Sequence, residues 1–163
     1  MTGMGANRTS SSIQLRSASL QDIEAMLTLL KQLFAIEADF AFDAEKQRTG
    51  LTQLIHSSLD AEPRAAVFVA TQNEKVVAMC SCQLVTSTAE GGTSGLVEDV
   101  IVDQAFRTQG IGQQLMCYVE QWAKARGLKR LQLLADTNNT PALGFYTKQG
   151  WQSTRLTALI KKL

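Results

Sequence analysis

The sequence contains little histidine, proline and cysteine, and each scarcity argues against a class of site. His56 is the only histidine among 163 residues, which disfavours a histidine-dependent catalytic triad or a multi-histidine metal site. The three cysteines are an odd number and come without a secretory leader, so a disulfide framework is not expected. No second Cys/His pair has the spacing of a zinc site, and we therefore expect no metal.

The chain also lacks a dominant charge and a long apolar run. A net charge of +1 gives no reason to expect a nucleic-acid or membrane-surface partner, so any anionic ligand needs a local site. No apolar run reaches transmembrane length. Residues 1–12 are rich in Gly, Ser and Thr and lack the apolar stretch of a signal peptide, which predicts a flexible tail and a cytoplasmic protein.

What is present is a chain that is 45% apolar, enough for one domain with its own core, expected at residues 13–163. Apolar periodicity predicts an α+β arrangement for this domain. Strands are expected at residues 13–16, 65–71, 76–85, 96–102 and 128–135, with one or two more from Trp151. Helices are expected at residues 23–34, after Asp43, from Gly110 and from Thr140, with a loop at 86–95.

One segment between a predicted strand and a predicted helix has the features of a phosphate-binding loop, Arg107-Thr-Gln-Gly110-Ile-Gly112. Its glycines let the backbone approach a ligand, and the free N–H groups and dipole of a helix start favour a pyrophosphate. Arg107 can add a charge-assisted hydrogen bond. The dinucleotide fingerprint fails because Leu115 replaces its third glycine, and no P-loop string occurs, which disfavours an NAD or ATP enzyme.

Two motifs together resemble those of the GNAT superfamily of acetyl-CoA-dependent N-acyltransferases. Arg107 to Gly112 matches the signature R/Q-x-x-G-x-G/A, although many members have Gly where Thr108 stands. The segment from Asn139 through Tyr146 to Trp151 is similar to the family segment N-x-x-A-x-x-F/L-Y-x-x-x-G-F/W. The resemblance covers residues 96–151 well and the N-terminal third in outline.

The resemblance implies a GNAT-like α/β fold: a mixed, mostly antiparallel, twisted sheet that splays at its central strands and is flanked by about four helices. It also implies acetyl-CoA as co-substrate, with the pantetheine arm in the splay, the pyrophosphate on the loop amides, and the Tyr146 hydroxyl at the thioester sulfur. The residues that it assigns to acetyl-CoA are Ile101, Val102, Arg107, Gln109, Gly110, Ile111, Gly112, Gln113 and Asn139.

Amine acylation needs a base for the ammonium proton and an acid for the leaving thiolate. Glu98, on the strand that leads into the loop, is the candidate base, and some family members carry an acidic residue at this position. Regular strand alternation would turn its neighbour Asp99 to the other face. Tyr146 is the candidate acid. The alternatives are a surface charge for Glu98 and a buried aromatic for Tyr146.

The predicted function is therefore N-acetylation of a primary amine of a small molecule, by direct attack in a ternary complex with acetyl-CoA. A protein lysine or N-terminal acetyltransferase, or a non-catalytic acyl-CoA-binding module, is the alternative; retention of Glu98 and Tyr146 favours an enzyme. The acceptor is open, as is a homodimer, which is common in the family. The residues that lie where family members build their acceptor pocket are Asp39, Phe40, Phe42, Asp43 and Glu45.

Overall fold

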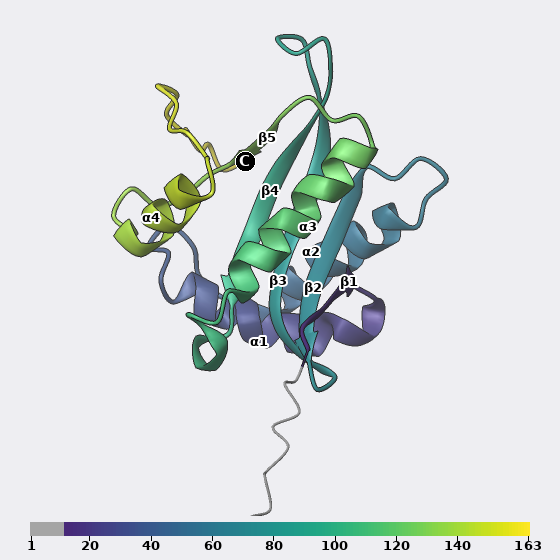
Figure 1. Ribbon diagram of the computed structural model, residues 1–163, viewed down its shortest axis with the longest axis vertical. Coiled ribbons are helices and arrows are strands. Elements are labelled where there is room, and N and C mark those ends of the chain that lie inside the picture. Colours follow the sequence, from purple (N-terminus) through teal and green to yellow (C-terminus); the bar gives the residue numbers. More distant parts are fainter. Residues whose placement is uncertain (1–11) are drawn as a thin grey trace, which may run out of the picture.

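A twisted sheet forms the centre of the computed structural model, which describes residues 12–163 (Figure 1). The strands, in their order across the sheet, are β1 (Gln14–Ser17), β2 (Ala65–Gln72), β3 (Lys75–Ser87), β4 (Gly92–Val102) and β5 (Leu131–Leu133). Strands β1 to β4 are antiparallel neighbours, whereas β5 runs parallel to β4. The sheet is mixed, mostly antiparallel and open, which confirms the predicted fold class.

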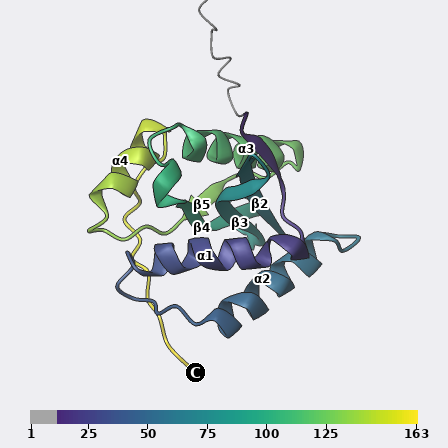
Figure 2. The ribbon, with the colours of Figure 1, turned by 90° about the horizontal axis from the view of Figure 1, so that it is seen from below.

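Helices cover both faces of this sheet. The α-helices of the described residues are α1 (Ile23–Phe34), α2 (Ala44–Ser58), α3 (Ile111–Ala125) and α4 (Thr140–Lys148), with short 3-10 turns η1 (Leu20–Asp22) and η2 (Gln104–Phe106). Figure 2 shows α1 and α2 on one side of the sheet and α3 on the other, with α4 beside the end that carries β4 and β5. No helix within residues 12–163 is long and apolar enough to cross a bilayer.

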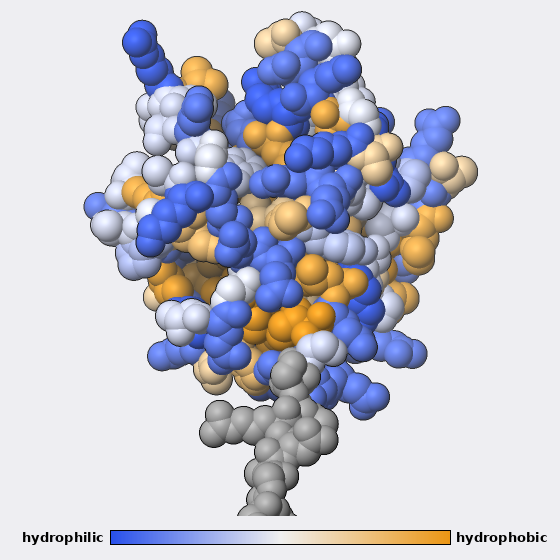
Figure 3. Space-filling view, viewed as in Figure 1, coloured by the Kyte–Doolittle hydropathy of each residue, from blue (hydrophilic) through white to orange (hydrophobic). Residues whose placement is uncertain are grey.

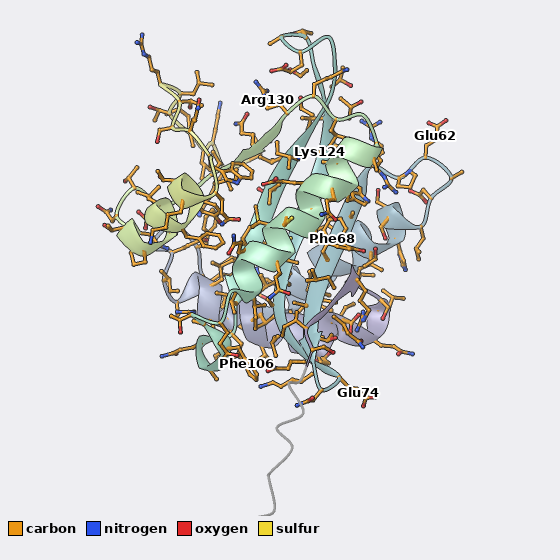
Figure 4. The ribbon with its side chains drawn as sticks, viewed as in Figure 1. Glu62, Phe68, Glu74, Phe106, Lys124 and Arg130 are labelled. Atoms are coloured by element: carbon orange, nitrogen blue, oxygen red, sulfur yellow. The ribbon has the colours of Figure 1, made fainter. Side chains whose placement is uncertain are left out.

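The core consists of two clusters, one on each face of the sheet. Met26 and Val67 belong to the cluster under α1 and α2, and Phe68 and Leu115 to the cluster under α3. Because helices cover both faces, β2 is apolar and buried along almost its whole length rather than alternating with polar residues. Figure 4 shows Phe68 beneath α3, where its ring meets Trp122 edge-on at 5.3 Å between centroids.

Two local signals set element boundaries. The side chain of Asp43 accepts hydrogen bonds from the amides of Glu45 and Lys46 and so caps α2. Asn73 and Glu74 both have positive φ, as the tight turn between β2 and β3 requires. These positions fix where the elements begin, and hence which faces they bury.

Three predicted boundaries were wrong. Most of the expected loop at 86–95 belongs to the β3–β4 hairpin, since β3 ends at Ser87 and β4 begins at Gly92. The strand expected at 128–135 is only Leu131–Leu133, and no strand follows Trp151. Residues 152–163 are exposed and none of them pairs with a strand of the sheet. The predicted tail at 1–12 lies outside the described residues except for Ser12.

Strand β4 carries the two irregularities that shape the site. Ser81 of β3 pairs with Glu98 and Met79 pairs with Ile101, so two residues of β4 oppose the single residue between them, which is a β-bulge. Asp99 lies in this bulge with φ +55°. Pairing with β5 stops at Val97, just before the bulge, although β4 continues to Val102.

Candidate functional site

The loop between β4 and α3 is fastened by hydrogen bonds to neighbouring elements. The Asp103 amide donates to the carbonyl of Val77 in β3 (2.8 Å), and the Gln104 amide donates to the side chain of Gln32 in α1 (3.0 Å). Arg107 donates through Nε to the carbonyl of Val102 at 3.1 Å and is exposed, which leaves its terminal nitrogens open to a ligand. The loop is thus tied to the sheet and to α1.

The start of α3 has several backbone amides without a partner inside the helix. Gly110 is the N-cap residue with φ +76°, a left-handed conformation, and has no side chain that could cap the helix. The first α-helical bond runs from the Gln114 amide to the Gly110 carbonyl (3.1 Å), so the amides before Gln114 point out of the helix end. With Arg107 beside them, these groups fit the diphosphate of acetyl-CoA.

Gly112 has a different role from Gly110. A Cβ at Gly110 would meet nothing within 4 Å, whereas a Cβ at Gly112 would lie 3.2 Å from Cζ of Phe145 and 3.4 Å from Cγ2 of Val102. The absent side chain of Gly112 therefore makes room for α4 rather than for a ligand. Its amide remains part of the helix start.

Tyr146 lies on α4 and packs against the apolar cluster under α3, which includes Cys80 of β3. Its half-buried ring packs edge-on against Trp151, with 5.9 Å between the centroids. Burial, followed by the neighbouring Cys80 and Glu37 groups, raises the pKa of the Tyr146 phenol to about 12. The phenol is therefore protonated at neutral pH and can donate a proton or a hydrogen bond.

The two adjacent carboxylates of β4 have different surroundings. Glu98 is exposed, and its Oε2 accepts a hydrogen bond of 2.6 Å from Nε2 of Gln83 in β3. Burial, followed by the charges of Glu98 and Glu37, raises the pKa of Asp99 to about 6. The expectation that Asp99 simply faces away assumed regular alternation, and the bulge breaks that regularity.

Two further carboxylates near this end were missed by sequence reasoning. Glu37 follows α1 and is half-buried; burial, then Asp136 and Asp39, raise its pKa. The charge of Glu37 in turn acts on both Asp99 and Tyr146. No motif identifies Glu37 or Asp136, because tertiary packing alone brings the end of α1 and the loop after β5 to the bulge.

The other predicted residues fall into two groups. Ile101 is buried and Val102 half-buried at the end of β4, where β5 has already departed, and Gln109 and Gln113 are exposed around the start of α3. Asn139 has a structural role: its Oδ1 accepts from the Ala142 amide (3.2 Å) and caps α4. The side-chain nitrogen of Asn139 remains available for a cofactor.

The expected acceptor-pocket residues are only partly assembled. Asp43 caps α2, and Glu45 pairs with Arg48 on the surface, so both carboxylates already have partners within the protein. Phe40 is half-exposed and lies 5.9 Å from Phe34, ring centroid to ring centroid. Of this set, Asp39 interacts with the Glu37 carboxyl near the bulge.

Two surface hollows flank the site rather than coinciding with it. A hollow of about 460 Å³ lies between α2 and β3 and includes Gln83, the residue that holds Glu98. A second, of about 370 Å³, runs along α3 from Gln113 to Gln121. The part of the chain that the structure describes holds no group of three or more His, Cys, Asp or Glu side chains placed for a metal ion.

Comparisons with known proteins identify a family for this fold. The model of the acetyltransferase (GNAT) family matches residues 27–151. An aminoalkylphosphonate N-acetyltransferase of Salmonella typhimurium is 23% identical over 141 residues, which cover 86% of each chain. An aminoglycoside N-acetyltransferase solved with CoA superposes with a TM-score of 0.79 at 16% identity, covering 96% of this chain and 99% of that one.

A predicted acetyltransferase of Clostridium acetobutylicum, solved with acetyl-CoA, superposes with a TM-score of 0.72 at 17% identity, covering 92% of this chain and 96% of the other. The structural likenesses show the fold, and the family match spans most of the sheet, the loop before α3 and α4. From this match, the chain belongs to the acetyltransferase (GNAT) family and is an acyltransferase.

Proposed function

We propose that the protein transfers the acetyl group of acetyl-CoA to a primary amine of a cationic small molecule, by direct attack in a ternary complex. The observation that carries this proposal is the set of acidic side chains around the open end of β4, beside Tyr146. Its members are Glu37, Asp39, Glu98, Asp99 and Asp136. Such a lining favours an ammonium-bearing acceptor and disfavours an anionic one, such as a phosphonate.

The start of α3 would bind the co-substrate. The outward amides of residues 111–113 and the free end of Arg107 offer donors to a diphosphate. The part of β4 beyond Val97 does not pair with β5 and would contact the pantetheine arm through its backbone. When bound there, acetyl-CoA supplies the acetyl group as a thioester. Holding the amine and the thioester carbonyl together would itself provide much of the acceleration.

A carboxylate of the β4 pair would take the ammonium proton, and the surroundings favour Asp99 over Glu98. An aliphatic ammonium has a pKa of about 10, so most of the acceptor arrives unable to attack. A general base works best with a pKa near the operating pH, and burial has moved the Asp99 carboxyl towards it. Glu98, tied to Gln83, is better placed to bind the acceptor near the hollow between α2 and β3.

Tyr146 would supply the final proton. As the amine nitrogen bonds to the acetyl carbon and the carbon–sulfur bond breaks, the phenol donates its proton to the departing thiolate. The phenolate then regains a proton from water or from the protonated base. The raised pKa of Tyr146 keeps this donor protonated before each turnover.

The test begins with a screen of mono- and polyamines with acetyl-CoA, read by thiol release. On the best acceptor, pH–rate profiles compare the wild type with Asp99→Asn and Glu98→Gln. Asp99→Asn should lower kcat about 10²- to 10⁴-fold at neutral pH and less at alkaline pH, where solvent deprotonates the amine. Glu98→Gln should mainly raise KM for the acceptor. The matched control is Glu62→Gln, on the side of the molecule away from α4 (Figure 4).

Each alternative has its own outcome. If Glu98→Gln changed the pH–rate profile strongly and Asp99→Asn did not, Glu98 would be the general base. Acetylation of lysine peptides but of no small amine would favour a protein acceptor. Acetyl-CoA binding without thiol release on either class would favour a non-catalytic module.

A further inference from the structure

The hollow of about 460 Å³ between α2 and β3 has a polar lining. It lies on the sheet face that α2 covers, opposite α3 (Figure 2). Its polar side chains are those of Gln53, Ser57, Arg64 and Gln83. Within residues 12–163, no hydrogen bond or ion pair engages the side chain of Gln53, Ser57 or Arg64. The hollow therefore offers a guanidinium, an amide and a hydroxyl group to a ligand.

Gly50 keeps this hollow open on the side of α2. It lies inside the helix, where a glycine is less stable than an alanine. Close packing does not require it, because a Cβ at Gly50 would meet nothing within 4 Å. Its φ is not positive, so backbone conformation does not require a glycine either. What the glycine provides is open space, and that space is part of the hollow that Gly50 lines.

Gln83 connects the hollow to the acidic end of β4. Its side chain lines the hollow, and its Nε2 donates to Oε2 of Glu98 at 2.6 Å. Glu98 pairs with Ser81 across the strands, and the hollow extends along β3 from Gln83 to Val85. At about 3.3 Å per strand residue, the hollow lies about 7–13 Å from the level of Glu98. An acceptor of that length with its amine at the β4 carboxylates would have its distant end in the hollow.

The charge of the hollow is opposite to that of the acidic end. Arg64 is exposed, and the other described residues that line the hollow are uncharged. The guanidinium repels a second ammonium group. Together with the amide of Gln53 and the hydroxyl of Ser57, it can donate hydrogen bonds to hydroxyl or carboxylate oxygens. The two ends therefore favour different groups, an ammonium at the carboxylates and an oxygen-bearing group in the hollow.

We propose that the hollow binds the distant end of the acceptor, and that the acceptor is an elongated primary amine with a hydroxyl or carboxylate group about 7–13 Å from its nitrogen. Arg64 and Gly50 then determine acceptor specificity, Arg64 through its charge and Gly50 by leaving room. This inference rests on the proposed function, because it assigns a second part to the same acceptor site. It disfavours simple diamines, whose second ammonium group would lie beside Arg64.

Four acceptors with the same carbon chain test the charge of the hollow: aminohexanol, aminohexanoate, hexylamine and diaminohexane. Thiol release from acetyl-CoA measures their acetylation. We expect the wild type to have a KM at least about fivefold lower for the two oxygen-bearing amines than for the other two. Arg64→Gln should remove most of this preference with little change in kcat. Arg126→Gln, which removes the same charge from the end of α3, is the matched control and should keep the preference.

Gly50→Leu tests the space in the hollow. Leucine is a better helix former than glycine, so the melting temperature should not fall. A side chain in the hollow should raise KM for aminohexanol about tenfold by excluding its hydroxyl group. KM for ethylamine, which is too short to reach the hollow, should stay the same.

The outcomes separate this inference from the proposed function. Equal KM values for the four amines in the wild type, or a preference for the oxygen-bearing amines that both Arg64→Gln and Gly50→Leu retain, would overturn the inference alone. No thiol release from any amine would overturn the proposed function and the inference together.

Discussion

Gly112 at the start of α3 lies directly against Phe145 of α4, close enough that a Cβ would stand 3.2 Å from its ring. Tyr146 follows Phe145 in the chain and its ring packs against that of Phe145, so this contact links the start of α3, where we propose that acetyl-CoA binds, to the predicted proton donor. Figure 3 looks onto the α3 side of the molecule, where hydrophilic side chains surround small apolar patches. The contact itself lies between α3 and α4, and a change at either residue should reach the other.

The Cβ that Gly112→Ala introduces should displace the ring of Phe145 and, with it, α4. We expect kcat to fall about tenfold, as for a misplaced catalytic group, while KM for acetyl-CoA changes less than about twofold. Phe145→Leu lacks the ring atoms that the new Cβ would meet and should restore most of the loss in the double variant. Gly144→Ala, with open space around it, is the control. Steady-state kinetics that show no rescue would mean that Gly112 acts through the cofactor instead.

Gly110→Ala should act through the backbone, because the new Cβ has room but φ is +76°. The left-handed conformation costs a residue with a Cβ about 1–2 kcal/mol, so unfolding free energy should fall by about that amount and acetyl-CoA should bind more weakly. Gly110→Asn should lose less, since asparagine tolerates this conformation. Urea unfolding and calorimetry measure both. Equal losses of stability and affinity in the two variants would indicate that the added side chain, and not the backbone φ, causes them.

Tyr146→Phe should lower kcat by about 10- to 10³-fold with little change in acetyl-CoA affinity. Because the pKa of this phenol is raised to about 12, its proton is retained through the neutral and mildly alkaline range, and no alkaline fall in rate from its loss is expected below pH ~10. Tyr118→Phe, on α3 against Phe68, is the matched control. Wild-type turnover in the Phe variant would make Tyr146 a packing residue.

The carboxyl group of Asp99 should also make the free energy of unfolding depend on pH. Its pKa is raised from 3.8 to about 6, so the folded protein holds a proton that the unfolded chain has lost between these values. Stability from this group is therefore present below pH 3.8 and declines as pH rises through about 6. The decline corresponds to about 3 kcal/mol at 1.36 kcal/mol per pH unit.

Asparagine tolerates the left-handed conformation of the bulge, and Asp99→Asn should abolish this decline. The free energy of unfolding of the variant should therefore rise relative to that of the wild type between pH 4 and 7. Unfolding free energies measured across that range provide the test. A constant difference between the two proteins would show that the carboxyl does not titrate in this window.

The sequence predicted those parts of the molecule that local chemistry determines. Asp43 and the Asn73–Glu74 pair mark element boundaries through hydrogen bonds and backbone conformation within a few residues, so their patterns could be read directly. The β-bulge could not, because nothing in residues 98–101 distinguishes a bulged strand from a regular one. The arrival of Glu37 beside Asp99 depends on how α1 packs on the sheet, which no spacing records.

Because the loop before α3 is held at several points, its rigidity should determine the kinetics of acetyl-CoA binding. Lys75 pairs with Asp103 at 3.5 Å and also lies over the Phe106 ring at 4.9 Å. These contacts add to the hydrogen bonds that the loop amides donate to Gln32 and Val77. Figure 4 shows Phe106 near the beginning of α3. A loop tied at this many points loses little conformational entropy when a ligand docks. Association should therefore be a single fast step, with no slow ordering phase in stopped-flow traces.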